Sequence, residues 1–492
     1  MEHFGIDIKS FRSKLNKSNS KLCVRTEMKE FSYKTRTDRR RRKLKKNKEL
    51  IFAFLGFIGS MVLCLIADIT MILPLAIGFV LFTLTAMHRG FAGKDVLRSA
   101  ADSLGESFIV IRILLLIGCL TGTWRLSGTV AYFVTFGVSV IPPRLFLLAA
   151  FLLAAVMSFA LGTSFGVTAT AGVILMSIAR AGGVDPVLAA GAILSGVYVG
   201  DRGSPAASSG NLVAVLTHTD IRKNVRLMLK TSLVPFFLCC VLYGLLSAKS
   251  PMQEADTAIL AMLENEFRLE WFCLIPAVLM IVLPFCKVSI KLSMGISLLA
   301  SAAVAFFVEG NSVSEILKAM ILGYKPENPG LSEMLSGGGI VSMLEVCVIL
   351  LISCSYGTIF RSTRLLADVN SGMKKLADRI GRFPVMVLLG FGVSAVFCNQ
   401  TIGGIMQSNL SEELYGNSDE EKTDKMIDME NSVIVIAGVV PWCIACSVPL
   451  SMLGGNAKSI PYALYMWLVT LWWLLVRMMQ DRKREKEIQP SC

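Results

Sequence analysis

Apolar runs follow one another from residue 50 to residue 478, and many are long enough to cross all or half of a lipid bilayer. The chain of 492 residues is 54% hydrophobic and only 17% charged, with a mean hydropathy of +0.62. This excess of apolar residues is too large for one buried core, so lipid must cover part of the surface. The composition excludes a soluble enzyme, a nucleic-acid module and a disordered scaffold.

Several of these runs are shorter than the roughly 20 residues that a full span needs, and Gly or Pro interrupts them. Short interrupted pieces are typical of discontinuous helices and re-entrant hairpins in transporters. We therefore predict an all-α polytopic membrane protein with about twelve transmembrane helices and two broken or re-entrant regions.

The pattern of runs and loops divides the chain into six parts. They are a basic cytoplasmic tail (1–49), two N-terminal spans with a linker (50–106), a first transporter repeat (107–248), acid-leaning loops with connecting spans (249–338), a second transporter repeat (339–478) and a cytoplasmic tail (479–492).

Positive charge is concentrated in the first part. Residues 1–49 carry 17 Lys/Arg against 6 Asp/Glu, so this tail holds +11 of the formal +13. A basic block beside a first span stays on the cytoplasmic face and attracts anionic lipid. RNA binding by the tail is the alternative, but no aromatic platform is interleaved with the basic residues, so we expect no nucleic-acid partner.

The remaining loops predict the orientation. The loops at 219–230 and 361–382 and the C-terminal tail are rich in Lys and Arg, which places them in the cytoplasm. The segments 249–270 and 411–428 lean towards acids, and we expect both outside. The chain is thus predicted to be a multi-pass protein of the cell membrane with both termini cytoplasmic.

The 13 cysteines and 3 histidines show no metal-ligand spacing. Most of the cysteines lie inside apolar runs, where they act as small apolar side chains. The sequence therefore predicts neither a disulfide framework nor a structural metal site.

The two halves of the chain resemble each other. The run LLIGCLTGT (115–123) matches LLISCSYGT (350–358) at an offset of 235, and SFALGTSFG (158–166) matches AVFCNQTIGG (395–404), which pairs Thr163 with Thr401 at 238. Pro205 pairs with Pro441 at 236. Loops that correspond in the two copies differ in charge, which indicates two inverted-topology repeats with a site at the midplane.

The densest polar cluster of the first half lies at 195–214, in the sequence SGVYVGDRGSPAASSGNLVA. Glycines and a proline break regular helix there, and hydroxyl, amide and carboxylate oxygens are the kind of hard ligands that suit a sodium ion. The alternative is a cytoplasmic turn in which Asp201 and Arg202 form a solvated pair. Our candidates in this stretch are Asp201, Ser204, Ser208 and Asn211.

Three further stretches supply candidates. Upstream lies LGTSFGVTATAG (161–172), for which helix packing through small residues is the alternative. In the second half, CNQTIGG (398–404) and MENS (429–432) hold polar groups at the ends of apolar runs, where they need partners. The candidates are Thr163, Ser164, Asn399, Gln400, Thr401, Glu430, Asn431 and Ser432.

These motifs, in this order from about residue 50 to residue 478, resemble the NhaC family of sodium/proton antiporters. The likeness also rests on GCLTGTWRLSGTV (118–130), LSGGGIVSML (335–344), VVPWC (439–443) and IPYAL (460–464). It implies exchange of sodium for protons, sometimes with an organic acid. The motif positions to which it points are Asp201, Ser204, Pro205, Asn211, Trp124, Glu430, Ser432 and Trp442.

The chain departs from the family pattern at three positions. Ser208, Asn399 and Asn431 are neutral where the family usually has Asp. An antiporter needs a carboxylate that binds either a proton or sodium. Asp201 and Glu430 remain, and they are our candidates for transient sodium binding.

Two functions follow from this pattern. The first is sodium/proton antiport, with sodium and the proton as transported species and no cofactor. The second is a carrier of a small organic solute, such as a carboxylate or an amino acid, with weak or no sodium coupling, which the three neutral positions favour. A passive channel or an intramembrane enzyme would need pore symmetry or a catalytic motif, and neither is visible. The oligomeric state stays open, with a homodimer as one alternative.

Overall fold

The computed structural model describes residues 48–67, 69–88, 90–102, 104–252, 257–286, 288–363 and 370–488. Within these ranges the regular structure is helical, apart from one isolated bridge between Tyr324 and Gly337. The prediction of an all-α membrane protein is confirmed. The arginine- and lysine-rich core of the N-terminal tail lies outside the described residues, so its contact with anionic lipid stays a prediction.

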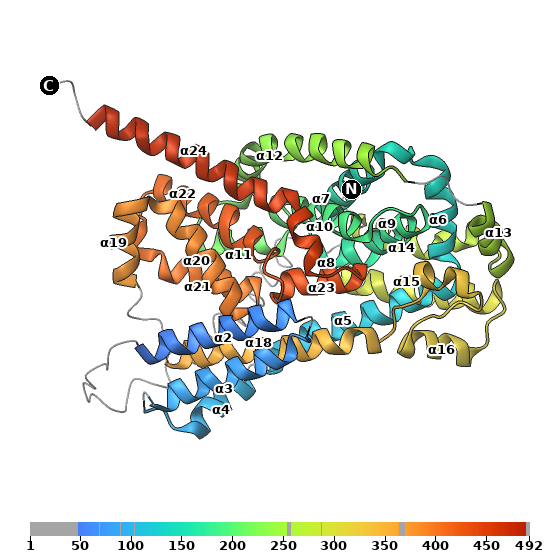
Figure 1. Cartoon of the computed structure of the whole chain (residues 1–492), viewed down its shortest axis with the longest axis horizontal. Coiled ribbons are helices and arrows are strands. Elements are labelled where there is room, and N and C mark those ends of the chain that lie inside the picture. Colours follow the sequence, from blue (N-terminus) through green and yellow to red (C-terminus); the bar gives the residue numbers. More distant parts are fainter. Residues whose placement is uncertain are drawn as a thin grey trace, which may run out of the picture. The chain divides into compact units, whose positions relative to one another are not determined.

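The helices fall into four groups along the chain (Figure 1). Three precede the repeats: α2 (Lys48–Ile66), α3 (Ile72–His88) and α4 (Gly93–Asp102). The first repeat comprises α5 (Leu104–Leu126), α6 (Thr129–Val140), η1 (Pro143–Leu145), α7 (Phe146–Leu161), α8 (Ser164–Val167), η2 (Thr168–Gly172), α9 (Val173–Ala181), α10 (Pro186–Gly203), α11 (Ser208–Thr217) and α12 (Ile221–Lys249).

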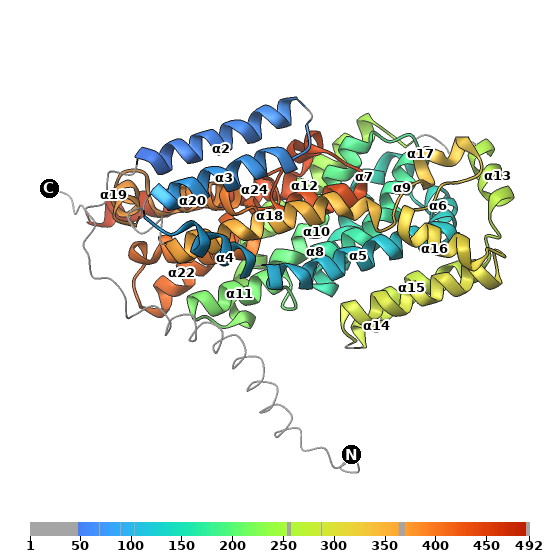
Figure 2. The same cartoon turned by 90° about the horizontal axis from the view of Figure 1, so that it is seen from below.

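The connecting group comprises α13 (Thr257–Glu266), η3 (Trp271–Leu274), α14 (Ile275–Phe285), α15 (Ile290–Phe307), α16 (Val313–Leu322), η4 (Pro329–Leu331) and α17 (Ser332–Leu335). The second repeat comprises α18 (Val341–Thr363), α19 (Asn370–Ile380), α20 (Arg382–Phe397), α21 (Gln400–Leu410), η5 (Glu412–Leu414), α22 (Asp419–Met429), η6 (Glu430–Ile434), α23 (Ile444–Leu453), η7 (Ala457–Tyr462) and α24 (Leu464–Ile488). The helices α2 and α3 lie beside α18 (Figure 2), where Phe54 stacks on Phe360.

Full-length spans are a minority among the apolar helices. By length and composition, four stretches of the described residues are long enough to cross a membrane. One further pair, α5 with α6, is bent by 66°, and several apolar helices have only 10–17 residues. On α12, Leu233, Phe237 and Val241 are exposed, as a lipid-facing surface requires. Broken helices, which the interrupted apolar runs predicted, are therefore a main feature of the fold.

The duplication is visible in the backbone at one constant offset of 236 residues. Gly162 and Cys398 both end a helix in the left-handed region, with φ of 67° and 53°. The residues that follow them, Thr163 and Asn399, cap the next helix with nearly equal φ and ψ. Ala207 with Cys443 and His218 with Gly454 match in the same way, whereas Asp220 and Asn456 share the role of helix cap but not the same φ and ψ.

This offset corrects the residue pairing that letter matching gave. Thr163 corresponds to Asn399, not to Thr401, since both are the helix-capping residues of the same turn. Several of the matched positions carry different amino acids, because a cap can be Thr, Asn or Asp. Matching identical letters therefore slips by two residues at this turn.

The two last helices of the repeats, α12 and α24, pack against each other in opposite directions. Near one end of the contact, the Tyr243 hydroxyl donates to the Tyr462 carbonyl at 2.7 Å and accepts from the Leu464 amide at 3.2 Å. Near the other end, Arg202 contacts the Met228 carbonyl and Asn431, whose own carbonyl accepts from Thr470. Matched helices that run antiparallel are what an inverted repeat produces.

The prediction that 411–428 lies on the opposite face from the loop 361–382 and the C-terminal tail is wrong. Glu421 pairs with Arg382 at 2.8 Å, and Asp424 pairs with Arg477 at 2.9 Å, so this segment lies with two regions that we assigned to the opposite face. In Figure 1, α22 lies near α19, whereas α13, from the other acid-leaning segment, lies at the opposite end. Acidic residues contribute little to orientation, and the rule counts Lys and Arg.

Candidate functional site

Two helical hairpins, one from each repeat, turn inside the protein. In the first, α7 ends at Gly162 and α8 begins at Ser164; in the second, α20 ends before Cys398 and α21 begins at Gln400. Each hairpin tip contacts a later helix of its own repeat at its start or in the non-helical segment just before it, α11 in the first repeat and α23 in the second. A Cβ at Gly162 would lie 2.6 Å from the Ala206 carbonyl carbon, and the Cys398 carbonyl accepts from the Ile444 amide at 2.8 Å.

Asp201 lies where the two tips meet. Ser164 Oγ donates to Asp201 Oδ1 at 3.2 Å, and Gln400 Nε2 donates to Asp201 Oδ2 at 3.2 Å. Ser164 and Gln400 are themselves matched residues at the 236 offset, each the first of its helix. The Asp201 side chain is buried. We expected Asp201 in an unwound stretch, but it lies in the last turn of α10, and the unwound stretch covers only residues 204–207. Each repeat thus supplies one donor to the same carboxylate.

Arg202 is fully buried but does not pair with its neighbour Asp201. Its Nη2 donates to Asn431 Oδ1 at 2.6 Å and to Thr231 Oγ1 at 2.8 Å, and its Nη1 donates to the Met228 carbonyl at 3.0 Å. The alternative of a solvated Asp–Arg pair at a cytoplasmic turn is therefore excluded. Arg202 connects the two repeats through Asn431.

Glu430, Asn431 and Ser432 are fully buried in a π-helical turn, η6, that continues α22. Such turns widen the helix and often occur at functional sites. Here the Ile434 carbonyl accepts from Gln400 Nε2 at 2.9 Å, which ties this turn to the hairpin tip. Both carboxylate oxygens of Glu430 are buried and have no hydrogen-bond partner among the described residues. The charges of Asp201 and Arg202 act on this carboxylate.

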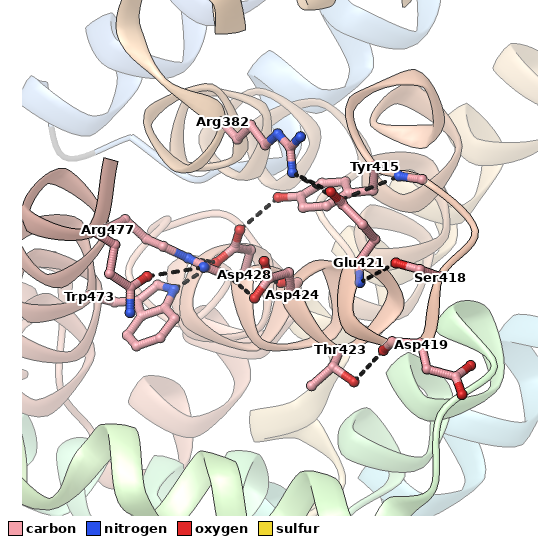
Figure 3. Close-up of polar contacts among 12 residues, drawn as sticks. Arg382, Tyr415, Ser418, Asp419, Glu421, Thr423, Asp424, Asp428, Trp473 and Arg477 are labelled. Atoms are coloured by element: carbon pink, nitrogen blue, oxygen red, sulfur yellow. Dashed lines mark hydrogen bonds and ion pairs between the residues drawn. The ribbon is translucent and has the colours of Figure 1, made fainter. Parts of the chain in front are cut away.

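A network that sequence reasoning missed anchors α22 (Figure 3). Asp428, two residues before Glu430, accepts from Trp473 Nε1 at 2.6 Å, from the Tyr415 hydroxyl at 2.7 Å and from Arg477 Nε at 3.0 Å. Arg477 also pairs with Asp424, one turn earlier. The sequence does show an acid, Asp428, two residues before Glu430. It does not show the partners of this acid, because two of them, Trp473 and Arg477, come from a distant helix.

The other predicted residues lie around this cluster rather than in it. Thr163 and Asn399 cap α8 and α21 through backbone amides. Ser208 and Thr401 are exposed, and Asn211 donates to carbonyls of its own turn. Ser204 accepts from the nearby Ala206 amide, and Ser432 exchanges hydrogen bonds with Gln407 of α21. Trp124 and Trp442 fix helix packing through Ser297 Oγ and the Ala395 carbonyl.

The arrangement brings together two buried carboxylates, a buried guanidinium and several uncharged oxygens. A carboxylate that is removed from water is costly to keep charged unless a cation or a proton compensates it. Two carboxylates near one guanidinium leave one negative charge to compensate. The site is therefore suited to hold one monovalent cation or one proton at a time.

The comparisons with known proteins agree with this geometry. The sequence profile described as "Na+/H+ antiporter family" matches residues 196–478, more than half of the chain and the part that holds both Asp201 and Glu430. A malate-2H(+)/Na(+)-lactate antiporter of Bacillus subtilis is 28% identical over 422 residues, which cover 82% of this chain and 89% of that protein.

Two further relatives show the range of the family. The Na(+)/H(+) antiporter NhaC of Alkalihalophilus pseudofirmus is 24% identical, over 80% of this chain and 87% of its own length. The arginine/ornithine antiporter ArcD of Halobacterium salinarum is 24% identical, over 76% of this chain and 79% of its own length. The chain therefore belongs to the Na+/H+ antiporter family and is a multi-pass membrane antiporter, not an enzyme.

Proposed function

We propose that this antiporter exchanges sodium ions for protons at the cluster around Asp201 and Glu430. The observation that carries the proposal is the Asp201 carboxylate, which is buried and accepts one hydrogen bond from each hairpin tip. Oxygen atoms of Ser164, Gln400 and Ile434 are close by and are ligands of the type that hard cations prefer. The NhaC relatives, which are named as Na(+)/H(+) antiporters, support the same ion pair.

Exchange follows from competition at a buried carboxylate. A proton and a sodium ion both neutralise the carboxylate, and the residual charge of the cluster has room for one of them. When the ion leaves on one side of the membrane, the other must bind before the site is again compensated. No cofactor takes part in this scheme. In this proposal the Asp428 side of the protein faces the cytoplasm, which the basic loops at 219–230 and 361–382 support.

A second candidate is the exchange of a small organic solute with weak or no sodium coupling. Arg202 favours this candidate. Its buried guanidinium follows Asp201 in the chain and already supplies one positive charge, which lowers the attraction of the cluster for a sodium ion. Relatives of this chain are named for malate and lactate and for arginine and ornithine.

Everted membrane vesicles separate the two candidates. Addition of sodium outside vesicles whose interior has been made acidic should dissipate the pH gradient when this protein is present, because sodium enters as protons leave. Potassium at the same ionic strength should have little effect. A proton flux that responds to organic acids or amino acids but not to sodium would reject the sodium/proton proposal in favour of the second candidate.

A further inference from the structure

A separate polar cavity of about 150 Å³ lies away from the Asp201 cluster, between the two repeats and the segment that follows α17. It is lined by residues of α5, α9, α18 and the end of α23, and of the segment 336–338. The described lining residues include two arginines, Arg125 and Arg180, and four serines, but no acid. Its lining is therefore positively charged and rich in hydroxyl groups.

Arg125 is the residue that carries the argument. It is only 6% exposed, yet within the part of the chain that the structure describes Nη1 donates just to the Thr121 carbonyl of its own helix, at 3.0 Å, and Nε is buried without a partner. A buried guanidinium normally pairs with a carboxylate or another set of acceptors, since an unsatisfied charge is costly inside a membrane protein. Among the described residues, Arg125 therefore has no anionic partner of the kind that its burial calls for.

The surrounding backbone leaves room for that partner. Gly337, Gly338 and Gly339 all have positive φ, between 76° and 125°, and carry no side chain into the cavity. A Cβ at Gly337 would be in van der Waals contact with Arg125 Nη2, at 3.9 Å, so the glycine keeps this side of the guanidinium free of a side chain. Ser177 and Ser342 also line the cavity, but their hydroxyl groups donate to the Val173 and Gly339 carbonyls, so the guanidinium is the donor that the argument uses.

We propose that this cavity binds the carboxylate of a small organic acid, with Arg125 as its main contact. A guanidinium can hold a carboxylate with two parallel hydrogen bonds, which a lysine cannot do. The volume corresponds to roughly five water molecules in the liquid, so a carboxylic acid of a few heavy atoms fits. Arg180, from the facing α9, adds a second positive charge on the opposite wall.

This site is distinct from the cation site of the proposed function. Ser164, at the start of the α8–η2–α9 stretch, contacts Asp201, whereas Arg180, sixteen residues further on, borders the cavity. At 1.5 Å per residue the two ends are about 24 Å apart. Binding of a carboxylate here therefore does not require that sodium or a proton binds at Asp201.

The test is equilibrium binding of radiolabelled lactate and succinate to the purified full-length protein in detergent. Arg125→Gln should weaken the binding of at least one acid by tenfold or more, and Arg125→Lys by less. Arg112→Gln is the matched control, since Arg112 is on the same helix but exposed, and it should leave the affinity unchanged. Asp201→Asn should also bind normally, which separates this proposal from the sodium/proton proposal.

Competition on the wild-type protein tests the ligand chemistry even where Arg125→Gln does not fold. Unlabelled lactate should displace the label, whereas lactamide, which has the same shape without the charge, and chloride at equal concentration should not. The proposal is overturned if the wild-type protein binds neither acid, if Arg125→Gln binds as well as the wild type, or if lactamide or chloride competes equally.

Discussion

Asp201 and Arg202 are neighbours in the chain, but each has its own partners in a different direction. Asp201 accepts from the two hairpin tips, while Arg202 reaches Asn431 and α12. The apolar context of Asp201 was enough to predict it as a site residue. The partner of Arg202 was not predictable, because Asn431 lies 229 positions away and only tertiary packing brings it close.

Asn431→Asp tests this division of partners. An acid at position 431 would be 2.6 Å from Arg202 Nη2 and should form an ion pair there rather than a sodium ligand. We expect the sodium concentration for half-maximal exchange to change less than threefold, with thermal stability equal to or above that of the wild type. A clear increase in sodium affinity, measured in vesicles, would show instead that position 431 faces the ion.

Competition at one carboxylate also predicts the response to pH. As pH falls, protons occupy the site more often, so more sodium is needed to displace them. The half-saturating sodium concentration should therefore rise as the pH on the sodium side falls, with little change in the maximal rate. Initial rates at several pH values measure this. A half-saturation that is independent of pH would mean that the proton and sodium do not share the site.

At the scale of elements, α22 with its π-helical turn is positioned by two arginines. Arg477 pairs with Asp424 and Asp428 in a largely buried setting, with side-chain exposures of 11% for Arg477 and 3% for Asp428. Arg382 pairs with Glu421 nearer the surface, with 45% and 29% exposed. The sequence predicted polar site residues at 429–432 but not this anchor, because ion pairs between distant helices leave no local pattern.

The two arginines provide a matched pair of substitutions. Arg477→Gln leaves a buried carboxylate without its cation and should lower stability by about 3–5 kcal/mol. Arg382→Gln removes a more exposed pair and should cost about 0–1 kcal/mol. Thermal unfolding of both purified variants, together with their exchange rates, checks this. Equal losses in the two variants would contradict the anchoring role of Arg477.

At the scale of the whole molecule, the fold is an inverted duplication. Loop charge and approximate repeats predicted it, and the antiparallel contact of α12 with α24 bears it out. The same inversion explains why 411–428 lies on the same side as 361–382 and not on the opposite face. Its counterpart in the first repeat lies near residues 182–185, which are close to Met252, so inversion puts 411–428 at the other end, beside Arg382. The charge of a single loop does not contain this information, since it depends on where the corresponding segment of the other repeat lies.

Accessibility of single cysteines tests the topology. Lys223→Cys and Glu420→Cys, in a cysteine-depleted background, should react with a membrane-impermeant maleimide from the same side, which we expect to be the cytoplasm. Lys458→Cys should react from the opposite side, since it lies just after Asn456, the counterpart of Asp220. All three positions are exposed. Labelling of positions 420 and 458 from one side would refute the inverted arrangement of the two repeats.

The most direct test of the account is radioactive sodium exchange in proteoliposomes that contain Asp201→Asn or its matched control, Asp185→Asn. Both substitutions occur on α10 or at its cap and remove one negative charge, but Asp185 is an exposed cap whose role Asn can take over. The account predicts that Asp201→Asn folds and loses at least 100-fold in sodium/proton exchange, while Asp185→Asn keeps the wild-type rate. Wild-type exchange by well-folded Asp201→Asn would contradict it.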